Sequence, residues 1–294
     1  MNKKIKQKEF IIEKTLLLFA GITIITTIAI IFTLFGESFL FFSEIPLWDF
    51  LTGTTWAPTL RPRSFGVLPL LVGTLMVAFF SSIISLPLGL GSAIYLSEYS
   101  NKKARKVIKP ILELLAGIPS IVYGFFALTF ITPLIRQILP QTEIFNVASA
   151  SIAIGIMTLP MVASLCEDAM MAVPDSVRNG AYALGSTKME VAIKIILPST
   201  ASSIASAFVL AISRAIGETM IVAIAAGQSP MLNFNPLASI QTMTGFMVNL
   251  SLGDIQQGTI EYKTLFAVGA MLFMITLIMN LIAKGILSRN KVRY

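Results

Sequence analysis

The sequence predicts an all-α integral membrane protein with six transmembrane helices and cytoplasmic N and C termini. Of its 294 residues, 55% are hydrophobic and 13% are charged, whereas soluble domains carry about 25% charged residues. Six apolar runs are about 20 residues or longer, which is the length of helix that crosses the hydrocarbon core of a bilayer. We place these spans at 15–36, 67–97, 111–139, 147–172, 195–228 and 264–287.

The distribution of basic residues predicts the orientation in the membrane. Most lysines and arginines fall in four segments on one side of the predicted spans: 3–14, 102–109, 178–194 and 284–293. The other side carries Arg61, Arg63, Arg136 and Lys263. Because cytoplasmic loops carry an excess of basic residues, both termini are predicted to be cytoplasmic. The net charge of +7 follows from this topology, which argues against nucleic-acid binding.

The composition also excludes several kinds of chemistry. The one cysteine, Cys166, cannot form an internal disulfide, and the lack of histidine excludes histidine-bound zinc and Ser-His-Asp triads. The sequence has no G-x-x-x-x-G-K-[ST] phosphate loop, which argues against ATP hydrolysis by this chain. We therefore predict that this chain is not an enzyme and binds no cofactor or metal.

Residues 1–65 are predicted to form an appendage made of a cytoplasmic N-terminus, the first span and an extracellular loop. The first apolar run is too long for a cleaved signal peptide, so we expect it to be retained as a span. We expect Trp48 and Trp56 in the loop to lie at the headgroup level rather than to bind a ligand.

Residues 66–287 are predicted to form a five-helix core, followed by a cytoplasmic tail at 288–294. Proline and glycine interrupt the core spans in the stretches "SLPLGLGS", "LAGIPSIVYG", "IGIMTLPMVAS" and "IILPSTASS". Such residues free backbone groups at membrane depth, which favours helices packed around a cavity. Close helix packing through small residues is the alternative for any single glycine.

The cytoplasmic loop 173–198 is predicted to contain two short helices. Asp175 or Ser176 can cap the first, and Gly185 can end it in a left-handed conformation. Thr187 starts the second helix, where Glu190 completes a capping box, and Pro198 bends it as it enters the fifth span. These helices suit either docking into a groove of another protein or lying on the membrane interface.

The stretch "GAYALGSTKMEVAIKIILP" resembles the coupling loop of bacterial ATP-binding-cassette (ABC) importer permeases. It keeps the small, glycine and Ile-x-Leu-Pro positions of that motif: Ala181, Ala183, Gly185, Ile195, Leu197 and Pro198. Gly180 stands where the motif has a glutamate. Two further stretches, "ELLAGIPSIVYGFFAL" and "SRAIGETMIVA", are similar to phosphate-specific importer permeases, and the segment Trp56–Leu75 is more similar to the PstC type than to its PstA-type partner.

This resemblance implies an ABC type I importer permease in the bacterial cytoplasmic membrane. The implied partners are a second homologous permease of the PstA type, a dimer of ATP-binding subunits that use ATP and magnesium, and an extracellular phosphate-binding protein. The implied contacts with the ATP-binding subunits come from the coupling loop: Gly180, Ala181, Ala183, Leu184, Gly185, Thr187, Glu190 and Pro198. The implied substrate is inorganic phosphate, with sulfate or molybdate as alternatives and an ATP-independent secondary transporter as a less favoured one.

A charged pair within the fifth span is the main candidate for the substrate pathway. Arg214 and Glu218 would lie one helical turn apart, beside a stripe of small polar residues that includes Ser206 and Ser213. Arginine and serine can donate hydrogen bonds to oxyanion oxygens. We expect Glu218 to hold Arg214 when the site is empty, or the pair to be a purely structural lock. Ser120 is a further pathway candidate.

Three acidic residues near helix ends are not expected to contact the substrate. Glu113 is expected to favour the positive end of its helix, and Glu167 and Asp168 are expected to be solvated.

Overall fold

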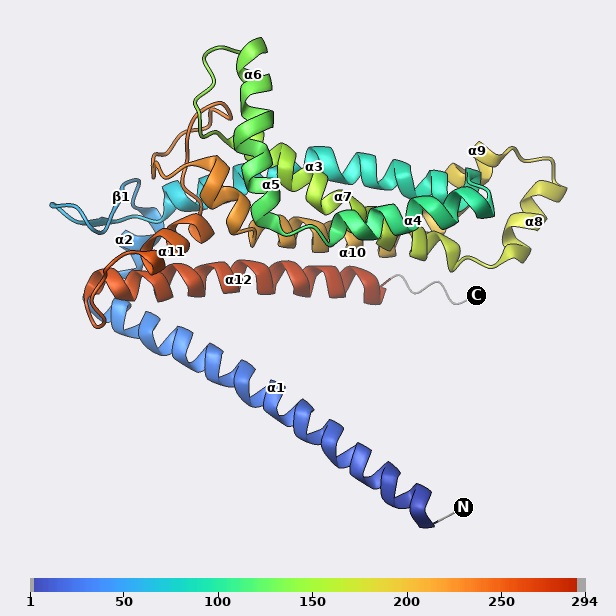
Figure 1. Ribbon diagram of the computed structural model, residues 1–294, viewed down its shortest axis with the longest axis horizontal. Coiled ribbons are helices and arrows are strands. Elements are labelled where there is room, and N and C mark those ends of the chain that lie inside the picture. The colour runs from blue at the N-terminus through green and yellow to red at the C-terminus, as the bar shows by residue number, and fades with distance from the viewer. Residues whose placement is uncertain (1–2, 290–294) are drawn as a thin grey trace.

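The computed structural model describes residues 3–289 and shows a bundle of long helices that lie roughly along one axis (Figure 1). Six helices in this part of the chain are long and apolar enough to cross a membrane, which confirms the predicted number. The described ends of the first and last helices point toward the same end of the bundle as the loop at 173–198 (Figure 1), as an even number of spans requires. The predicted tail at 288–294 lies outside the described residues from residue 290 onward.

The first helix, α1 (Lys3–Glu44), meets the rest of the bundle near its C-terminal end. It is unbroken and longer than the predicted span at 15–36. Ser38 Oγ donates a hydrogen bond of 2.8 Å to the carbonyl of Phe266 in the last helix, α12 (Ile260–Arg289). Toward its N-terminus α1 diverges from α12 (Figure 1), so most of its apolar side chains have no partner within the described part of this chain.

A short helix and a two-stranded antiparallel hairpin connect the first two spans: α2 (Leu47–Thr52), β1 (Trp56–Ala57) and β2 (Ser64–Phe65). Trp56 is buried edge-on against Phe246, with the two ring centroids 4.9 Å apart. Trp56 therefore packs within the protein, among neighbouring aromatic rings, and does not present its ring to lipid headgroups. Trp48 is exposed.

The centre of the bundle consists of α3 (Leu68–Ile94), its π-helical extension η1 (Tyr95–Tyr99) and α7 (Val147–Met171). Glycines allow the two helices to approach closely, since Gly89 of α3 faces Val162 and Gly155 of α7 faces Ile84. Pro87 and Pro160 lie inside these helices without ending them, so these two predicted interruptions do not occur as breaks. In a packed bundle, neighbouring groups can satisfy the carbonyls that such prolines leave free.

The third span begins at Ser120, nine residues later than predicted. The segment before it forms a separate amphipathic helix, α4 (Lys102–Ala116), which packs along α7. The span itself is a stack of short helical segments, α5 (Ser120–Phe126), η2 (Ala127–Ile131) and α6 (Thr132–Ile138). The chain changes direction at Gly117–Pro119 (Figure 1), since proline disfavours helical conformation in the residue before it.

The loop at 173–198 contains the two predicted helices, α8 (Asp175–Ala183) and α9 (Lys188–Val191). Pro174 occupies the cap position of α8, so the predicted side-chain cap from Asp175 or Ser176 is absent. The left-handed conformation of Gly185 (φ 82°) and the capping box of Thr187 and Glu190 are confirmed.

From α9 the chain runs without a break into the fifth span through a π-helical segment, η3 (Ala192–Ile196), and then α10 (Leu197–Ile216). Pro198 lies in the first turn of α10. A wider π turn just before it is a common way to relieve the clash between a proline ring and the preceding turn.

The predicted fifth span at 195–228 is too long, because α10 ends at Ile216. After a break at Gly217–Thr219 the chain forms a short buried π-helical segment, η4 (Val222–Ala226), which ends at Gly227 with φ 104°. An irregular segment then leads to α11 (Met243–Leu252) and on to α12. The motif "SRAIGETM" therefore lies at a helix end and not near the middle of a continuous helix.

We expect Gly89→Ala to destabilise the bundle. The new Cβ would lie 2.6 Å from Val162 Cγ1 and 3.3 Å from the Ala163 nitrogen, so α3 and α7 would have to separate. Overpacking of this kind costs about 1–3 kcal/mol. The matched control is Gly91→Ala, whose Cβ meets nothing within 4 Å. Thermal unfolding in detergent should show a lower midpoint only for Gly89→Ala, and equal midpoints for the two variants would contradict the close packing.

Candidate functional site

The helix break after α10 is held in place by buried hydrogen bonds. Glu218 is buried, and its Oε1 accepts a hydrogen bond of 3.3 Å from the backbone N–H of Ile221, which begins the next helical segment. Thr244 of α11 donates from its Oγ1 to the carbonyl of Glu218 at 2.6 Å. These contacts satisfy backbone groups that the break would otherwise leave unpaired in an apolar surrounding.

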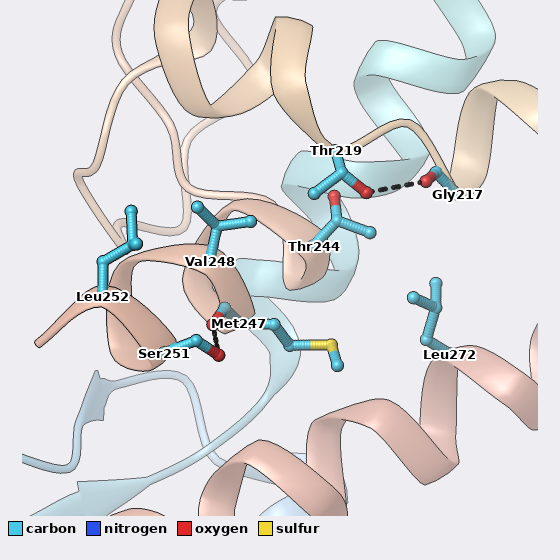
Figure 2. Close-up of a pocket in the computed structure, with 8 residues that line it drawn as sticks. All are labelled: Gly217, Thr219, Thr244, Met247, Val248, Ser251, Leu252 and Leu272. Carbon is cyan, nitrogen blue, oxygen red and sulfur yellow. Dashed lines mark hydrogen bonds between the residues drawn. The ribbon is translucent and has the colours of Figure 1, made fainter. Parts of the chain in front are cut away.

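A cavity of about 410 Å³ lies beside this break, between the end of α10, α11 and α12 (Figure 2). Its lining carries three hydroxyl groups, and each already donates to a carbonyl: Thr219 to Gly217, Thr244 to Glu218 and Ser251 to Met247. Each hydroxyl has already used its hydrogen, so its oxygen can only accept a further hydrogen bond. An anion needs donors. This cavity therefore does not by itself have the chemistry of an oxyanion site.

Arg214 and Glu218 do not pair in the structure, which contradicts the expected contact between them. No described carboxylate lies within 4 Å of the Arg214 guanidinium. The physical reason is the end of α10: Gly217 caps the helix, so the one-turn spacing of a continuous helix does not apply to these residues.

Arg214 instead lines a second cavity, of about 290 Å³, formed with α4 and α7. The other charged residues that line it are Lys109 and Glu113 from α4 and Glu167 from α7. Arg214 is exposed in this single chain. The acidic residues that share this cavity with it thus come from other helices.

Glu167 is the centre of an ion-pair cluster that joins α4 to α7. Its side chain is only 1% exposed, so its predicted solvation is wrong, whereas Asp168 is exposed as expected. Arg105 Nε lies 2.5 Å from one Glu167 oxygen and Lys109 Nζ lies 3.3 Å from the other. Neither oxygen has a hydrogen bond of good geometry, so the contacts are ionic.

Lys109 also connects to the exposed carboxylate of this cluster. Its Nζ donates to Asp168 Oδ1 at 3.0 Å, and this hydrogen bond is the main cause that raises the pKa of Lys109 above its usual value of 10.5. The ammonium group therefore remains charged throughout the neutral pH range.

The serines predicted for the pathway have different surroundings. Ser206 Oγ bonds to the carbonyls of Ser202 (3.0 Å) and Ala283 (3.1 Å), so it packs α10 against α12. Ser213 lies two turns further along α10 and is buried with no hydrogen-bond partner among the described residues. Ser120 is the half-buried first residue of α5. The structure does not bring these three hydroxyls together at one cavity.

The loop at 173–198 presents an apolar side chain at the joint between its two helices. Leu184 is 90% exposed, whereas Ala181 points into the body of the loop and is buried. Gly180 and Ala183 are exposed, and Gly185 turns the chain in open space, where an added Cβ would meet nothing within 4 Å. Lys194 Nζ lies 3.0 Å from Glu190 Oε1 and adds to the cap of α9.

Sequence reasoning missed the buried ion pair that ties this loop to the bundle. Arg178 of α8 lies 3.3 Å from Glu98 in η1, and both side chains are largely buried. The only sequence signal was a basic residue in a cytoplasmic loop, which the positive-inside rule already explained. Glu98 lies at the end of the predicted second span, where an exposed charged residue is common.

The fold defines the class of protein. A chain of a bacterial alginate ABC transporter, solved in complex with a periplasmic protein that binds an alginate pentasaccharide, matches with a TM-score of 0.68 over 96% of this chain and 98% of its own length. The sequence identity is 17%, so this likeness concerns the fold alone. The fold is that of an ABC importer permease, as predicted.

The chain belongs to the family described as "Binding-protein-dependent transport system inner membrane component", which it matches over residues 85–292. The probable ABC transporter permease protein YqgH of Bacillus subtilis is 34% identical over 87% of this chain and 82% of its own length. The phosphate transport system permease protein PstC of Xylella fastidiosa is 31% identical over 82% of this chain and 79% of its own length. This chain is therefore a multi-pass inner membrane permease component and not the ATPase.

We expect Glu167→Gln to loosen α4 from α7. The change leaves Arg105 and Lys109 facing a buried neutral group, and we expect a cost of about 1–3 kcal/mol, below the value for a fully buried pair because both cations are partly exposed. The measurement is the thermal unfolding midpoint, together with thiol labelling of a cysteine placed at Leu112, which lines the cavity next to α7.

The matched control is Asp168→Asn, which removes an exposed partner of Lys109 and should cost no more than about 1 kcal/mol. Equal midpoints and equal labelling rates for the two variants would contradict a structural role for the buried carboxylate. The native thiol, Cys166, is buried and should contribute little labelling.

Proposed function

We propose that this chain is one of two membrane-spanning subunits of an ATP-driven importer that translocates inorganic phosphate delivered by an extracellular binding protein. The observation that carries the phosphate assignment is the likeness to PstC proteins over about four fifths of this chain. The stretches "ELLAGIPSIVYGFFAL" and "SRAIGETMIVA", which resemble phosphate-specific permeases, support it. Within this proposal the chain is the PstC-type subunit.

The unpartnered helix surfaces support a second, homologous permease subunit of the PstA type. The apolar segment of α1 is unburied within this chain. On α10, Leu210, Arg214 and Gly217 are exposed. A charged side chain that faces lipid is costly, so we place the second subunit against this face of α10 and the anion path between the two subunits.

The loop at 173–198 supports a dimer of ATP-binding subunits as partners. An exposed leucine at the joint of two short helices suits insertion into a groove of another protein. ATP and magnesium would be bound by those subunits, and this chain would bind no cofactor of its own.

Arg214 is the residue that we place in contact with phosphate. Its guanidinium offers several donors in a planar fork, and no described carboxylate occupies them. Lys109 and Arg105 add positive charge nearby, and Glu113 and Glu167 add the negative charge that keeps anion binding weak enough for release. Ser213 offers a free hydroxyl on the same helix.

This proposal gives different roles to the other pathway candidates, Glu218, Ser206 and Ser120. Glu218 holds the helix break in shape and so sets the position of Arg214 just before it. Ser206 and Ser120 remain candidates for contact with the anion only if α10 or α5 moves relative to its neighbours. A permease for sulfate or molybdate would share all of these features, whereas a secondary transporter working alone would not need the exposed coupling loop.

The experiment that tests this function is uptake by sealed vesicles that hold the complete complex and the binding protein. We expect labelled phosphate to enter only when ATP is present, and excess sulfate or molybdate to compete poorly because phosphate is the proposed substrate. Uptake by this chain alone, or uptake indifferent to ATP, would contradict an ATP-driven importer. Transport of sulfate at the same rate as phosphate would contradict the assignment of phosphate as the substrate.

We expect Arg214→Gln to lower phosphate uptake by about tenfold or more, since hydrogen bonds to charged groups contribute about 1.5–3 kcal/mol. The matched control is Lys103→Gln, which removes one exposed positive charge from α4. Uptake is measured in vesicles with the amount of assembled complex determined in parallel. Normal uptake by Arg214→Gln in an intact complex would rule out the contact with phosphate.

A further inference from the structure

Arg178 has an arrangement that the topology and the coupling-loop motif do not explain. Its side chain is 11% exposed although it belongs to a cytoplasmic loop. Its guanidinium donates to the carbonyl of Met170 (2.7 Å), in the last turn of α7, and to the carbonyl of Val173, two residues after that helix ends. The same group lies 3.3 Å from Glu98 Oε1, and the Glu98 side chain is 2% exposed.

These contacts join three elements through one side chain. The last carbonyls of a helix have no regular partner within the helix, and here the guanidinium adds a hydrogen bond to the Met170 carbonyl of α7 and one to the carbonyl of Val173 in the connection that follows. Glu98 lies in η1, the π-helical end of α3. Arginine suits this position because its planar fork can donate in several directions at once.

The neighbouring residue of η1 holds the second helix of the loop. Tyr99 donates from its hydroxyl to Met189 Sδ at 3.5 Å, and Lys188 Nζ lies 6.0 Å from the centre of the Tyr99 ring. Successive residues of η1 therefore contact α8 through Glu98 and α9 through Tyr99. Both helices of the loop are attached to the same end of α3.

The other end of α3 contacts the elements that hold the helix break. Thr74 Oγ1, which is buried, accepts a hydrogen bond of 3.0 Å from the backbone N–H of Met243 at the start of α11. The next residue, Thr244, donates to the carbonyl of Glu218. Since α3 is continuous from Leu68 to Ile94, its two ends form a direct physical connection between the loop and the break.

We propose that Arg178 is a positioning residue that fixes the loop 173–198 to α3 and α7, so that displacement of the loop reaches the break at Glu218 through α3. This inference rests on the proposed function, in which ATP-binding subunits move the loop. It assigns the transmission of that movement to one buried ion pair and two carbonyl contacts. Without them, the loop can move without α3.

The test compares Arg178→Gln with Asp175→Asn in the assembled complex. Asp175 is the control because it is also near Arg178, at 3.7 Å, but its side chain is 92% exposed. We expect Arg178→Gln to lower phosphate uptake per ATP hydrolysed by about tenfold or more while ATP hydrolysis continues. Asp175→Asn should resemble the wild type, and an unchanged ratio for Arg178→Gln would overturn the proposal.

A rescue experiment separates transmission from folding. Cysteines replace Tyr99 and Met189, and a short bifunctional thiol reagent then links α3 to the loop in the Arg178→Gln background. We expect the link to restore uptake per ATP, and failure to restore it would overturn the proposal. If Arg178→Gln prevents assembly, Glu98→Gln takes its place, since it keeps both carbonyl contacts. Normal coupling in Glu98→Gln would then count against the proposal.

A distance measurement tests the role of Arg178 without using any substrate. Its result is therefore independent of the phosphate assignment. Spin labels at Tyr99 and Leu184 report the distance between α3 and the tip of the loop in the purified complex. We expect a narrow distance distribution in the wild type and in Asp175→Asn, and a broad one in Arg178→Gln. Absent phosphate uptake by the wild type would refute the substrate alone, whereas equally narrow distributions would refute the role of Arg178.

Discussion

The close packing of α3 against α7 is the constraint on which the rest of the structure depends. Gly89 and Gly155 bring the two backbones together, because a side chain at either position would overlap a branched residue of the other helix. At one end this pair holds the loop at 173–198 through Glu98 of η1 and the Met170 carbonyl of α7, both of which contact Arg178. At the other end α3 holds the start of α11 through Thr74. In lipid, where helices gain little from burying apolar surface, close contact through small residues and buried hydrogen bonds is what holds such a pair together.

Helix breaks determine where polar groups can be placed within this bundle. At the break at Gly217–Thr219, Glu218 does not pair with Arg214: its carboxylate accepts from the N–H of Ile221, just after the break, and its carbonyl accepts from Thr244 of α11. The break at Gly117–Pro119 separates α4 from the third span, and the Tyr123 hydroxyl donates across it to the carbonyl of Leu115 at 2.9 Å. Broken backbone at membrane depth is tolerated because protein groups replace the missing hydrogen bonds. The result is a set of short segments that surround two cavities next to α10.

The charged residues show where interpretation from the sequence succeeds and where it fails. Apolar run length was enough to predict the six spanning helices, because that signal depends only on local composition. By contrast, the count of basic residues by side treated Arg178 as one more cytoplasmic charge, and Glu167 was interpreted as a solvated residue at a helix end, although both are buried in ion pairs. Their partners, Glu98 and Arg105, lie far away along the chain. No local pattern indicates such a pair, since each residue alone has an ordinary explanation.

The sequence by itself determined that this chain has six helices long and apolar enough to cross a membrane, and that the loop at 173–198 contains two short helices. It also determined local features such as the capping box of Thr187 and Glu190 and the left-handed Gly185, because these depend on residues only a few positions apart. Only the tertiary structure decided that Arg214 faces a cavity beside α4 while Glu218 bonds within the break, and that Ser206 bonds to α12. The physical reason is that the polar pattern assumed a continuous helix, whereas the point at which a helix ends depends on the neighbours that can satisfy its freed backbone groups.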